Sequence, residues 1–183
     1  MAGLEDEALG GVTRVGRILI LCVLAWFTWG FARADVGAAA VDSFLHLPDL
    51  VFHEAGHVIF SPLGQFMTVL GGSLLQCLVP LILAGAFLRQ RDGFGAAVCT
   101  WWAGQNLVDI APYIADARAL RLPLIGGRTG AEVEGHDWEF LLAALNWTHL
   151  DRAIGLGTYR LGLVVMIAAL AAAAAITART RRT

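Results

Sequence analysis

Residues 66–88 form a run without a single charged side chain, and this run limits the possible folds more than any other part of the sequence. An α-helix rises about 1.5 Å per residue, so a helix of this length can cross the roughly 30 Å hydrocarbon core of a bilayer. The rest of the chain agrees with a membrane setting, because 57% of its 183 residues are hydrophobic, compared with about 45–50% in a typical soluble domain. We therefore predict an all-α fold, a multi-pass transmembrane helical bundle.

Four more apolar segments raise the expected number of spans to about five. They cover residues 18–32, 43–61, 93–115 and 161–178. The polar residues 1–17 before them are expected to form an unstructured N-terminal tail, which leaves residues 18–183 as a single membrane domain. Residues 138–150 are amphipathic and shorter, so we expect them to lie at the membrane interface rather than to cross.

Two features of the membrane arrangement stay open at this stage. Residues 18–32 resemble a signal peptide in the small residues around Arg33, whereas the long acidic leader and two tryptophans favour a retained helix, which we expect. The arginines that follow residues 88 and 178 favour a cytoplasmic location at both points. If all five segments cross, however, Arg14 and Arg17 fall on the opposite side of the membrane, so the charges conflict.

The net charge and the cysteines narrow the range of partners and cofactors. A net charge of −2 at pH 7 gives no indication of nucleic-acid binding. The three cysteines lie in apolar runs without C-x-x-C spacing, which is typical of small buried residues rather than of disulfides or metal ligands. The partners that remain are the lipid bilayer and other membrane proteins.

The second apolar segment carries the motif H-E-x-x-H, formed by His53, Glu54 and His57. Side chains four residues apart share one face of a helix, so the two histidines can hold one metal ion together. Neutral imidazoles suit Zn²⁺, and a zinc ion with an open coordination position activates water near neutral pH. Glu54 is close enough to take the proton from that water and later pass it to a leaving amine.

A motif with only three fixed positions, such as H-E-x-x-H, also occurs by chance in many proteins. The alternative to a metal site is therefore a helix whose histidines and glutamate are only hydrogen-bonded. The apolar residues on both sides of the motif argue against this alternative, because burying ionisable groups costs several kcal/mol unless they are paired or bind metal. Zinc is therefore the expected cofactor. Asp49, one turn before His53, could accept the second ring N–H of that histidine or merely cap the helix, and the sequence leaves both roles open.

A polar stripe is expected on the segment of residues 93–115 and just beyond it. Asn106, Asp109, Tyr113 and Asp116 fall at helical spacing on one face. Pro112 lies among them and should kink the helix, which frees backbone carbonyls that protein or water must satisfy. Such a stripe in a membrane helix indicates an internal site rather than a lipid-facing surface.

In this order, the H-E-x-x-H motif, an uncharged middle segment and a third segment with Asn106, Pro112 and Asp116 resemble the core of the site-2 protease family of intramembrane metalloproteases. The resemblance covers about residues 44–117. It implies a three-helix core in which Asp116 is the third zinc ligand, while Asn106 holds the substrate backbone or the oxyanion. Asp109 is a rival ligand, because it stands where the family's usual Asn-x-x-Pro pattern has proline, and Asp116 precedes Ala117 instead of the usual glycine.

The resemblance implies a zinc-dependent intramembrane endopeptidase that hydrolyses peptide bonds of transmembrane protein substrates in the cell membrane. The rival is a non-enzymatic multi-pass membrane protein that binds or transports a divalent metal, because His, Asp and Asn side chains inside a bundle would serve that purpose too. Glu54 favours the enzyme, since a binding site has no need of a non-ligating glutamate between two ligands. His136 and Asp137 in the following polar loop have no counterpart in the family core; a solvated pair is the favoured interpretation and a cap over the site the alternative.

Overall fold

The computed structural model describes residues 2–36 and 43–179, with side chains from residue 11 onward. All regular secondary structure in this described part of the chain is helical, which confirms the all-α prediction. The elements are, in order, α1 (Ala2–Arg33), α2 (His46–Phe60), η1 (Ser61–Leu63), α3 (Gln65–Arg89), α4 (Gly93–Asp116), α5 (Asp137–Ala144), η2 (Thr148–Leu150) and α6 (Asp151–Arg179).

Three helical segments are long and apolar enough to cross a membrane, rather than the expected five. They are Gly11–Arg33, Gln65–Arg89 and Thr148–Arg179. The motif helix α2 has 15 residues and is therefore only about 22 Å long, which is less than the bilayer core. Helix α4 is longer, but most of its residues are buried inside the protein. It can carry polar side chains because other helices, rather than lipid, surround it.

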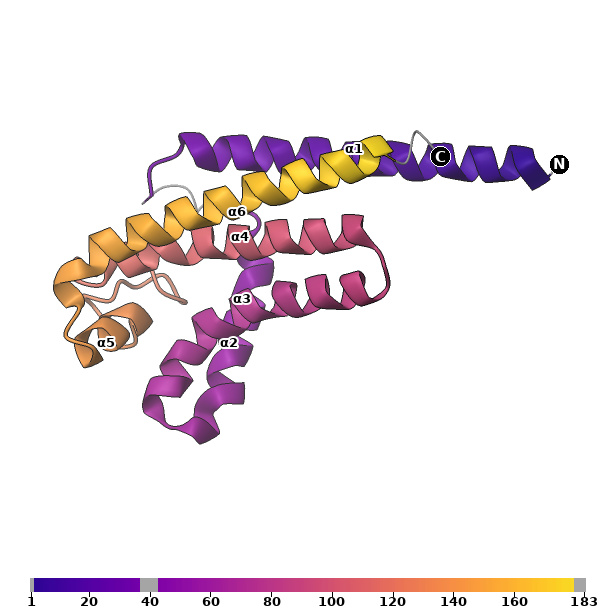
Figure 1. Ribbon diagram of the computed structural model, residues 1–183. Coiled ribbons are helices and arrows are strands. Elements are labelled where there is room, and N and C mark those ends of the chain that lie inside the picture. The colour runs from indigo at the N-terminus through magenta and orange to yellow at the C-terminus, as the bar shows by residue number, and fades with distance from the viewer. Residues whose placement is uncertain (1, 37–42, 180–183) are drawn as a thin grey trace.

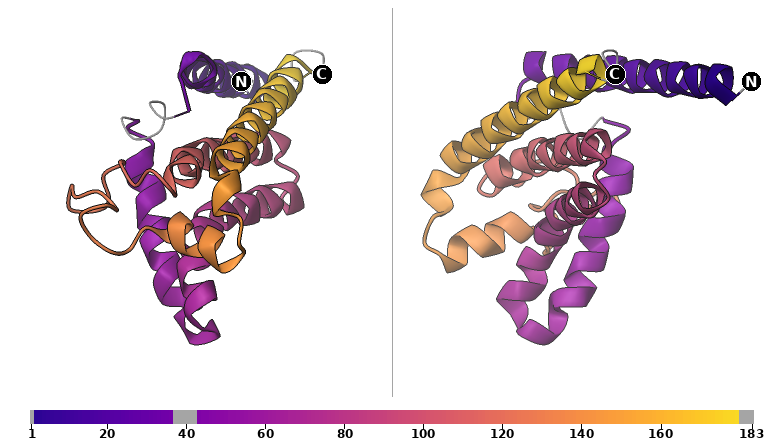
Figure 2. Two further views of the ribbon diagram at one scale, coloured as in Figure 1. Left: turned by 90° about the vertical axis from the view of Figure 1, so that its left-hand side faces the viewer. Right: turned by 45° about the vertical axis from the view of Figure 1, so that its right-hand side comes forward.

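The helices lie in layers, with α4 in the middle. Helices α1 and α6 lie together on one side of α4, and α3 lies on its other side (Figures 1 and 2). Helix α2 runs steeply across these layers and pairs with the first part of α3. This arrangement places the motif helix beside the inner helices α3 and α4 rather than at the end of a parallel bundle.

Glycines permit a close contact between α4 and α6. A Cβ atom on Gly162 of α6 would lie 2.6 Å from the carbonyl oxygen of Gly104 on α4, and a Cβ on Gly104 would lie 2.8 Å from the carbonyl oxygen of Gly162. Side chains at either position would push the backbones apart, so the pair resembles the small-residue contacts of membrane helices. The two helices thereby form a rigid support for the polar face of α4.

The first apolar segment is part of this core. The Trp101 indole N–H donates a hydrogen bond to Thr28 Oγ1 at 2.8 Å, and the Tyr159 hydroxyl donates one to the Phe31 carbonyl oxygen at 2.6 Å. These bonds tie the end of α1 to α4 and α6. The polar residues 1–17, expected to be an unstructured tail, instead continue α1 back to Ala2, where leucine, alanine and glutamate favour helix and no proline interrupts it.

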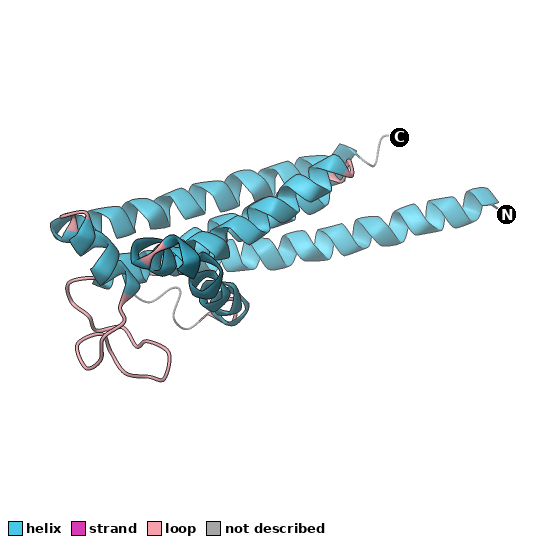
Figure 3. Ribbon diagram, turned by 90° about the horizontal axis from the view of Figure 1, so that it is seen from below, coloured by secondary structure: helices cyan, strands magenta, loops and turns pink. Residues whose placement is uncertain are grey.

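A long loop of residues 117–136 connects α4 with α5 at the end of the bundle away from the two termini (Figure 3). Arg118 binds the buried carboxylate of Asp151 through two hydrogen bonds of 2.6 and 2.9 Å. The Tyr113 hydroxyl donates a hydrogen bond to the Pro123 carbonyl oxygen at 3.1 Å. The predicted interfacial helix is shorter than expected and is divided into α5 and η2. The anchored loop brings the start of α5 back toward the motif helix.

Candidate metal centre

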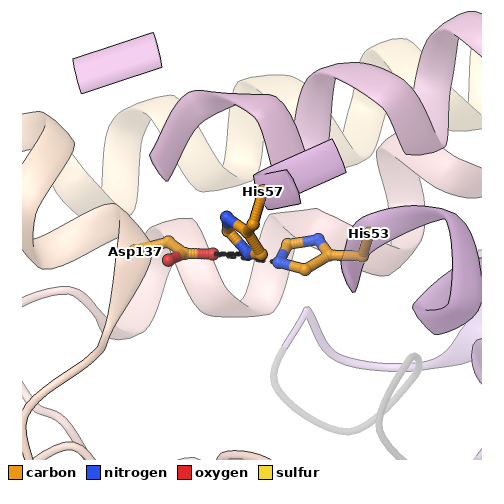
Figure 4. Close-up of side chains that lie close together, drawn as sticks. All are labelled: His53, His57 and Asp137. Atoms are coloured by element: carbon orange, nitrogen blue, oxygen red, sulfur yellow. Dashed lines mark hydrogen bonds and ion pairs between the residues drawn. The ribbon is translucent and has the colours of Figure 1, made fainter. Parts of the chain in front are cut away.

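Three side chains from distant parts of the sequence meet at one point: His53, His57 and Asp137 (Figure 4). The Nε2 atoms of His53 and His57 lie 2.9 and 3.3 Å from the same carboxylate oxygen, Oδ2 of Asp137. One potential ligand atom from each residue lies within 4.8 Å of the others. The histidines occupy successive turns of α2, and the aspartate is the first residue of α5. The cluster thus joins two elements that α3, α4 and a long loop separate in the sequence.

Helix α5 holds Asp137 in place by docking on α3 and α4. His136 caps its N-terminus, because His136 Nδ1 accepts a hydrogen bond from the Glu139 backbone N–H at 3.1 Å. The Trp138 indole N–H donates a hydrogen bond to Ser73 Oγ on α3 at 3.2 Å, and Leu142 is buried against α4. A carboxylate in the first turn of a helix is also favoured by the positive end of the helix dipole.

The second nitrogen of each histidine has its own acceptor. His53 Nδ1 lies 3.0 Å from Gln76 Oε1, and His57 Nδ1 lies 2.9 Å from the carbonyl oxygen of Thr68. A carbonyl oxygen can only accept, so both Nδ1 atoms carry the proton. In a neutral ring Nε2 then presents a lone pair, and both Nε2 atoms lie close to the Asp137 carboxylate.

Two lone pairs and a carboxylate oxygen repel one another unless a cation lies between them. Protons on the imidazoles would remove this repulsion, and so would a metal ion. The donor set fits Zn²⁺, which is bound by His nitrogen and Asp oxygen at about 2.0–2.2 Å. Three protein ligands leave the fourth tetrahedral position open, as in catalytic rather than structural zinc sites.

A glycine keeps space free beside these nitrogens. A Cβ atom on Gly72 of α3 would lie 2.7 Å from His53 Nε2 and equally 2.7 Å from His57 Nε2. Any larger residue would occupy the volume that an ion between the two rings needs. The residues present therefore fit a bound metal in shape as well as in donor chemistry.

The cluster faces a cavity of about 470 Å³ between α2, α4 and the long loop. Glu54 lines this cavity beside the two histidines, and so does His136. His136 is 3% exposed, and its Nε2, which carries the proton because Nδ1 accepts, has no hydrogen-bond partner among the described residues; Asp116 Oδ2, at 3.8 Å, is too far away to accept one. Apolar side chains form much of the remaining wall: Leu50, Ile110, Leu124, Ile125, Val133 and Trp138. The cavity thus combines a candidate metal-binding cluster, a carboxylate and a donor without a hydrogen-bond partner among the described residues.

A second histidine–aspartate pair, His46 and Asp109, lines the same cavity. His46 Nδ1 lies 3.0 Å from Asp109 Oδ1 and 3.1 Å from Oδ2. The hydrogen bond to Asp109 raises the pKa of His46 above its ordinary value of 6.5. The carboxylate of Asp109 also accepts a hydrogen bond from Gln76 Nε2 at 2.8 Å. Asp109, the rival third ligand of the sequence analysis, is therefore engaged by other donors and lies outside the metal cluster.

The structure does not place Asp116 or Asn106 where the family resemblance implied. Asp116 Oδ2 accepts a hydrogen bond from the Leu122 backbone N–H at 2.8 Å, so Asp116 fixes the start of the loop, and Asp137 stands in the cluster instead. Asn106 is completely buried, and its Nδ2 donates to the Trp102 carbonyl oxygen at 3.0 Å. It is not among the residues that line the cavity.

Asp49 also has neither of the roles left open by the sequence. Its carboxylate accepts a hydrogen bond from the Trp102 indole N–H at 2.8 Å, and it makes no side-chain cap to the start of α2. Gln76 takes the place beside His53 Nδ1 that the sequence analysis considered for Asp49. Asp49 is fully buried and connects α2 with α4, away from the metal cluster.

Asp137 is the cluster residue whose role the sequence indicated least. Its one signal was its position in a His-Asp pair at the end of a polar loop, immediately before an amphipathic segment. A histidine that caps a helix fixes the direction of the residue after it, so this boundary was the clue to a side chain held in place.

Comparisons with protein-family models, with curated proteins and with solved structures find no match to this chain.

Proposed function

We propose that this chain is a zinc-dependent intramembrane endopeptidase, similar in mechanism to the site-2 proteases. One observation carries the proposal: two imidazoles with their Nδ1 protons engaged elsewhere turn their Nε2 atoms toward one carboxylate oxygen, in a cavity that Glu54 also lines. The ligands proposed for zinc are His53, His57 and Asp137. The family resemblance implied Asp116 as the third ligand, but the geometry favours Asp137.

Each residue around the proposed metal has its own role in peptide hydrolysis. When bound here, zinc would polarise the scissile carbonyl and lower the pKa of a water molecule. Glu54 takes a proton from the attacking water and returns it to the leaving amine nitrogen. The unpaired Nε2–H of His136 is the donor available for the substrate carbonyl oxygen, in the role that the sequence analysis gave to Asn106.

The substrate we propose is an extended segment of another membrane protein. A cavity of about 470 Å³ admits a few residues of unwound peptide rather than an intact helix with its side chains, since a helix is about 10–12 Å wide. The apolar wall suits the side chains of such a segment. Three helices of sufficient length support a multi-pass protein of the cell membrane as its setting.

The test compares zinc content and cleavage in the same detergent-purified sample. Substrates are fluorescein-labelled casein and a reconstituted single-span membrane protein. We expect about one zinc per chain, and we expect Glu54→Gln to retain zinc while cleavage falls by about 10²–10⁴-fold, because the amide cannot accept a proton. Glu139→Gln, on the exposed side of α5, is the matched control and should cleave normally.

The outcomes separate the proposal from its rival. Cleavage that Glu54→Gln leaves unchanged would refute the protease mechanism. Stoichiometric zinc in a wild-type protein that cleaves neither substrate would favour the non-enzymatic protein that binds or transports a divalent metal. A wild-type protein without zinc at saturating concentration would refute the zinc peptidase and exclude zinc as the metal of its rival.

A further inference from the structure

A chain of hydrogen bonds runs from His53 through two buried side chains to His46. His53 Nδ1 lies 3.0 Å from Gln76 Oε1, Gln76 Nε2 donates to Asp109 Oδ2 at 2.8 Å, and His46 Nδ1 lies 3.0 Å from Asp109 Oδ1. Gln76 is 2% exposed and Asp109 is 3% exposed. Water therefore has little access to either side chain, and each depends on the other members of the chain for its hydrogen bonds.

The direction of every bond in this chain follows from the carboxylate at its centre. An ionised aspartate can only accept, so the Gln76 amide must turn its NH₂ group toward Asp109 and its oxygen toward His53. His53 must then donate from Nδ1, and His46 must donate from its own Nδ1. One carboxylate thus sets the proton position on two imidazoles that do not touch each other.

We propose that Gln76, Asp109 and His46 are positioning residues that hold His53 with its proton on Nδ1, so that Nε2 is free for the metal. The inference rests on the metal centre of the proposed function. His57 obtains the same result by a different means, because its Nδ1 donates to the main-chain carbonyl of Thr68. Substitution of side chains in the chain of hydrogen bonds should therefore disturb one ligand and spare the other.

Partners that orient a metal-binding histidine contribute about 10–100-fold in metal affinity. We expect Asp109→Leu to lower zinc affinity by this factor, because the Gln76 amide loses its fixed orientation and His53 loses its defined acceptor. Thr68→Ala is the matched control, since it removes a side chain but keeps the carbonyl that fixes His57, and its affinity should equal that of the wild type. Affinity is measured by competition with a chromophoric chelator, on protein shown by its elution volume and helical circular dichroism to be folded.

Asp109→Asn gives a sharper test, because asparagine can accept from one neighbour and must donate to the other. Zinc on Nε2 of His53 would keep the proton of that ring on Nδ1, so in the zinc-loaded variant the oxygen of the new amide accepts from Gln76 and its NH₂ group faces His46. The proton of His46 should then move from Nδ1 to Nε2. The ¹⁵N chemical shifts of labelled histidine rings report this change, and His57 should show none.

Two results would overturn the inference while the metal centre stands. One is zinc binding by Asp109→Leu as tight as that of the wild type; the other is a zinc-loaded Asp109→Asn protein in which His46 Nδ1 keeps its proton. If the wild type binds no zinc, the metal centre itself fails. The ring nitrogens of the metal-free wild type then test the orientation alone: a His53 without a proton on Nδ1 would refute it, and one with that proton would support it.

Discussion

Gly72 lies against the two imidazole nitrogens that face Asp137, and this contact makes it the most restrictive residue of the site. A Cβ atom at this position would lie 2.7 Å from Nε2 of both His53 and His57. We expect Gly72→Ala to abolish zinc binding, because the added methyl group occupies the ion's place. Gly85→Ala is the control on the same helix, since nothing lies within 4 Å of its Cβ position. Metal analysis of both variants decides the matter, and a fully loaded Gly72→Ala protein would show that the ion lies elsewhere.

The third ligand can be identified by ranking three aspartates. We expect Asp137→Asn to reduce zinc content strongly, while Asp116→Asn reduces it little, because Asp116 is occupied by the Leu122 N–H. Asp109→Asn should have an intermediate effect, because its amide can accept from Gln76 only while its NH₂ group faces His46. Mass spectrometry of the three purified proteins gives the ranking. A greater loss in Asp116→Asn than in Asp137→Asn would restore the ligand implied by the family resemblance.

At the residue scale the sequence predicted the two histidines, which lie on one helix, but it did not predict Asp137 as the third member of the cluster. That His53 and His57 lie side by side follows from helical spacing, which is set by hydrogen bonds four residues apart. Asp137 reaches them through a loop of residues 117–136, whose path depends on particular contacts such as the Arg118–Asp151 pair. No periodic rule describes such a path, so the sequence left Asp137 as a possible cap.

The contact between α4 and α6 depends on the glycine pair described above, and it can be tested within one helix. We expect Gly162→Ala to lower stability by about 1–3 kcal/mol, because its Cβ would lie 2.6 Å from a backbone oxygen of α4 and the helices must separate. Gly157→Ala lies on the same helix with nothing within 4 Å, and replacing a helical glycine there should be neutral or stabilising by up to about 1 kcal/mol. Unfolding in mixed detergent micelles measures both changes. An equal gain in the two variants would mean that helix propensity, not packing against α4, governs position 162.

The observed ends of the helices show where the sequence pattern alone was sufficient to predict an element. The uncharged run of residues 66–88 became Gln65–Arg89, and residues 93–115 became Gly93–Asp116. A short charged turn of residues 90–92 ends α3, and its Asp92 caps the start of α4. The expectation of five spans was less successful, since hydropathy of a segment does not reveal whether lipid or protein surrounds it. Helix α4 illustrates this difference: its polar residues are accommodated because α3 and α6 cover it.

The fold brings arginine-bearing parts of α1, α3 and α6 to one end of the bundle. The Arg17 guanidinium of α1 lies 5.1 Å from the centre of the Phe94 ring at the start of α4, and a Cβ on Gly93 would lie 3.2 Å from Ile176 near the end of α6. Only residues 90–92 separate α3 from α4. The middle of α1, the α3–α4 turn and the end of α6 therefore share one end of the bundle, and the first half of α1 extends beyond it (Figure 1).

This arrangement predicts that both termini face the same side of the membrane. Helices α1, α3, α4 and α6 alternate in direction, so if α4 crosses with the three candidate spans, the number of crossings is even. Five crossings would instead have placed the termini on opposite sides, which was the source of the conflict between Arg14 and Arg17 and the later arginines. Reporter domains fused to each end, assayed by protease protection in sealed vesicles, should respond alike. Opposite responses would refute the arrangement.

The 84 positions between His53 and Asp137 have a consequence during biosynthesis. A ribosome adds about 5–20 residues per second, so the two histidines would precede the aspartate by about 4–17 seconds. By the end of that interval the growing chain would hold the motif helix and all of α4 but would still lack its third ligand. The proposed peptidase would therefore be inert while it is still being inserted, and would acquire its metal only once α5 has docked. Neighbouring chains that leave the same translocation machinery would then be protected from cleavage by the order of synthesis alone.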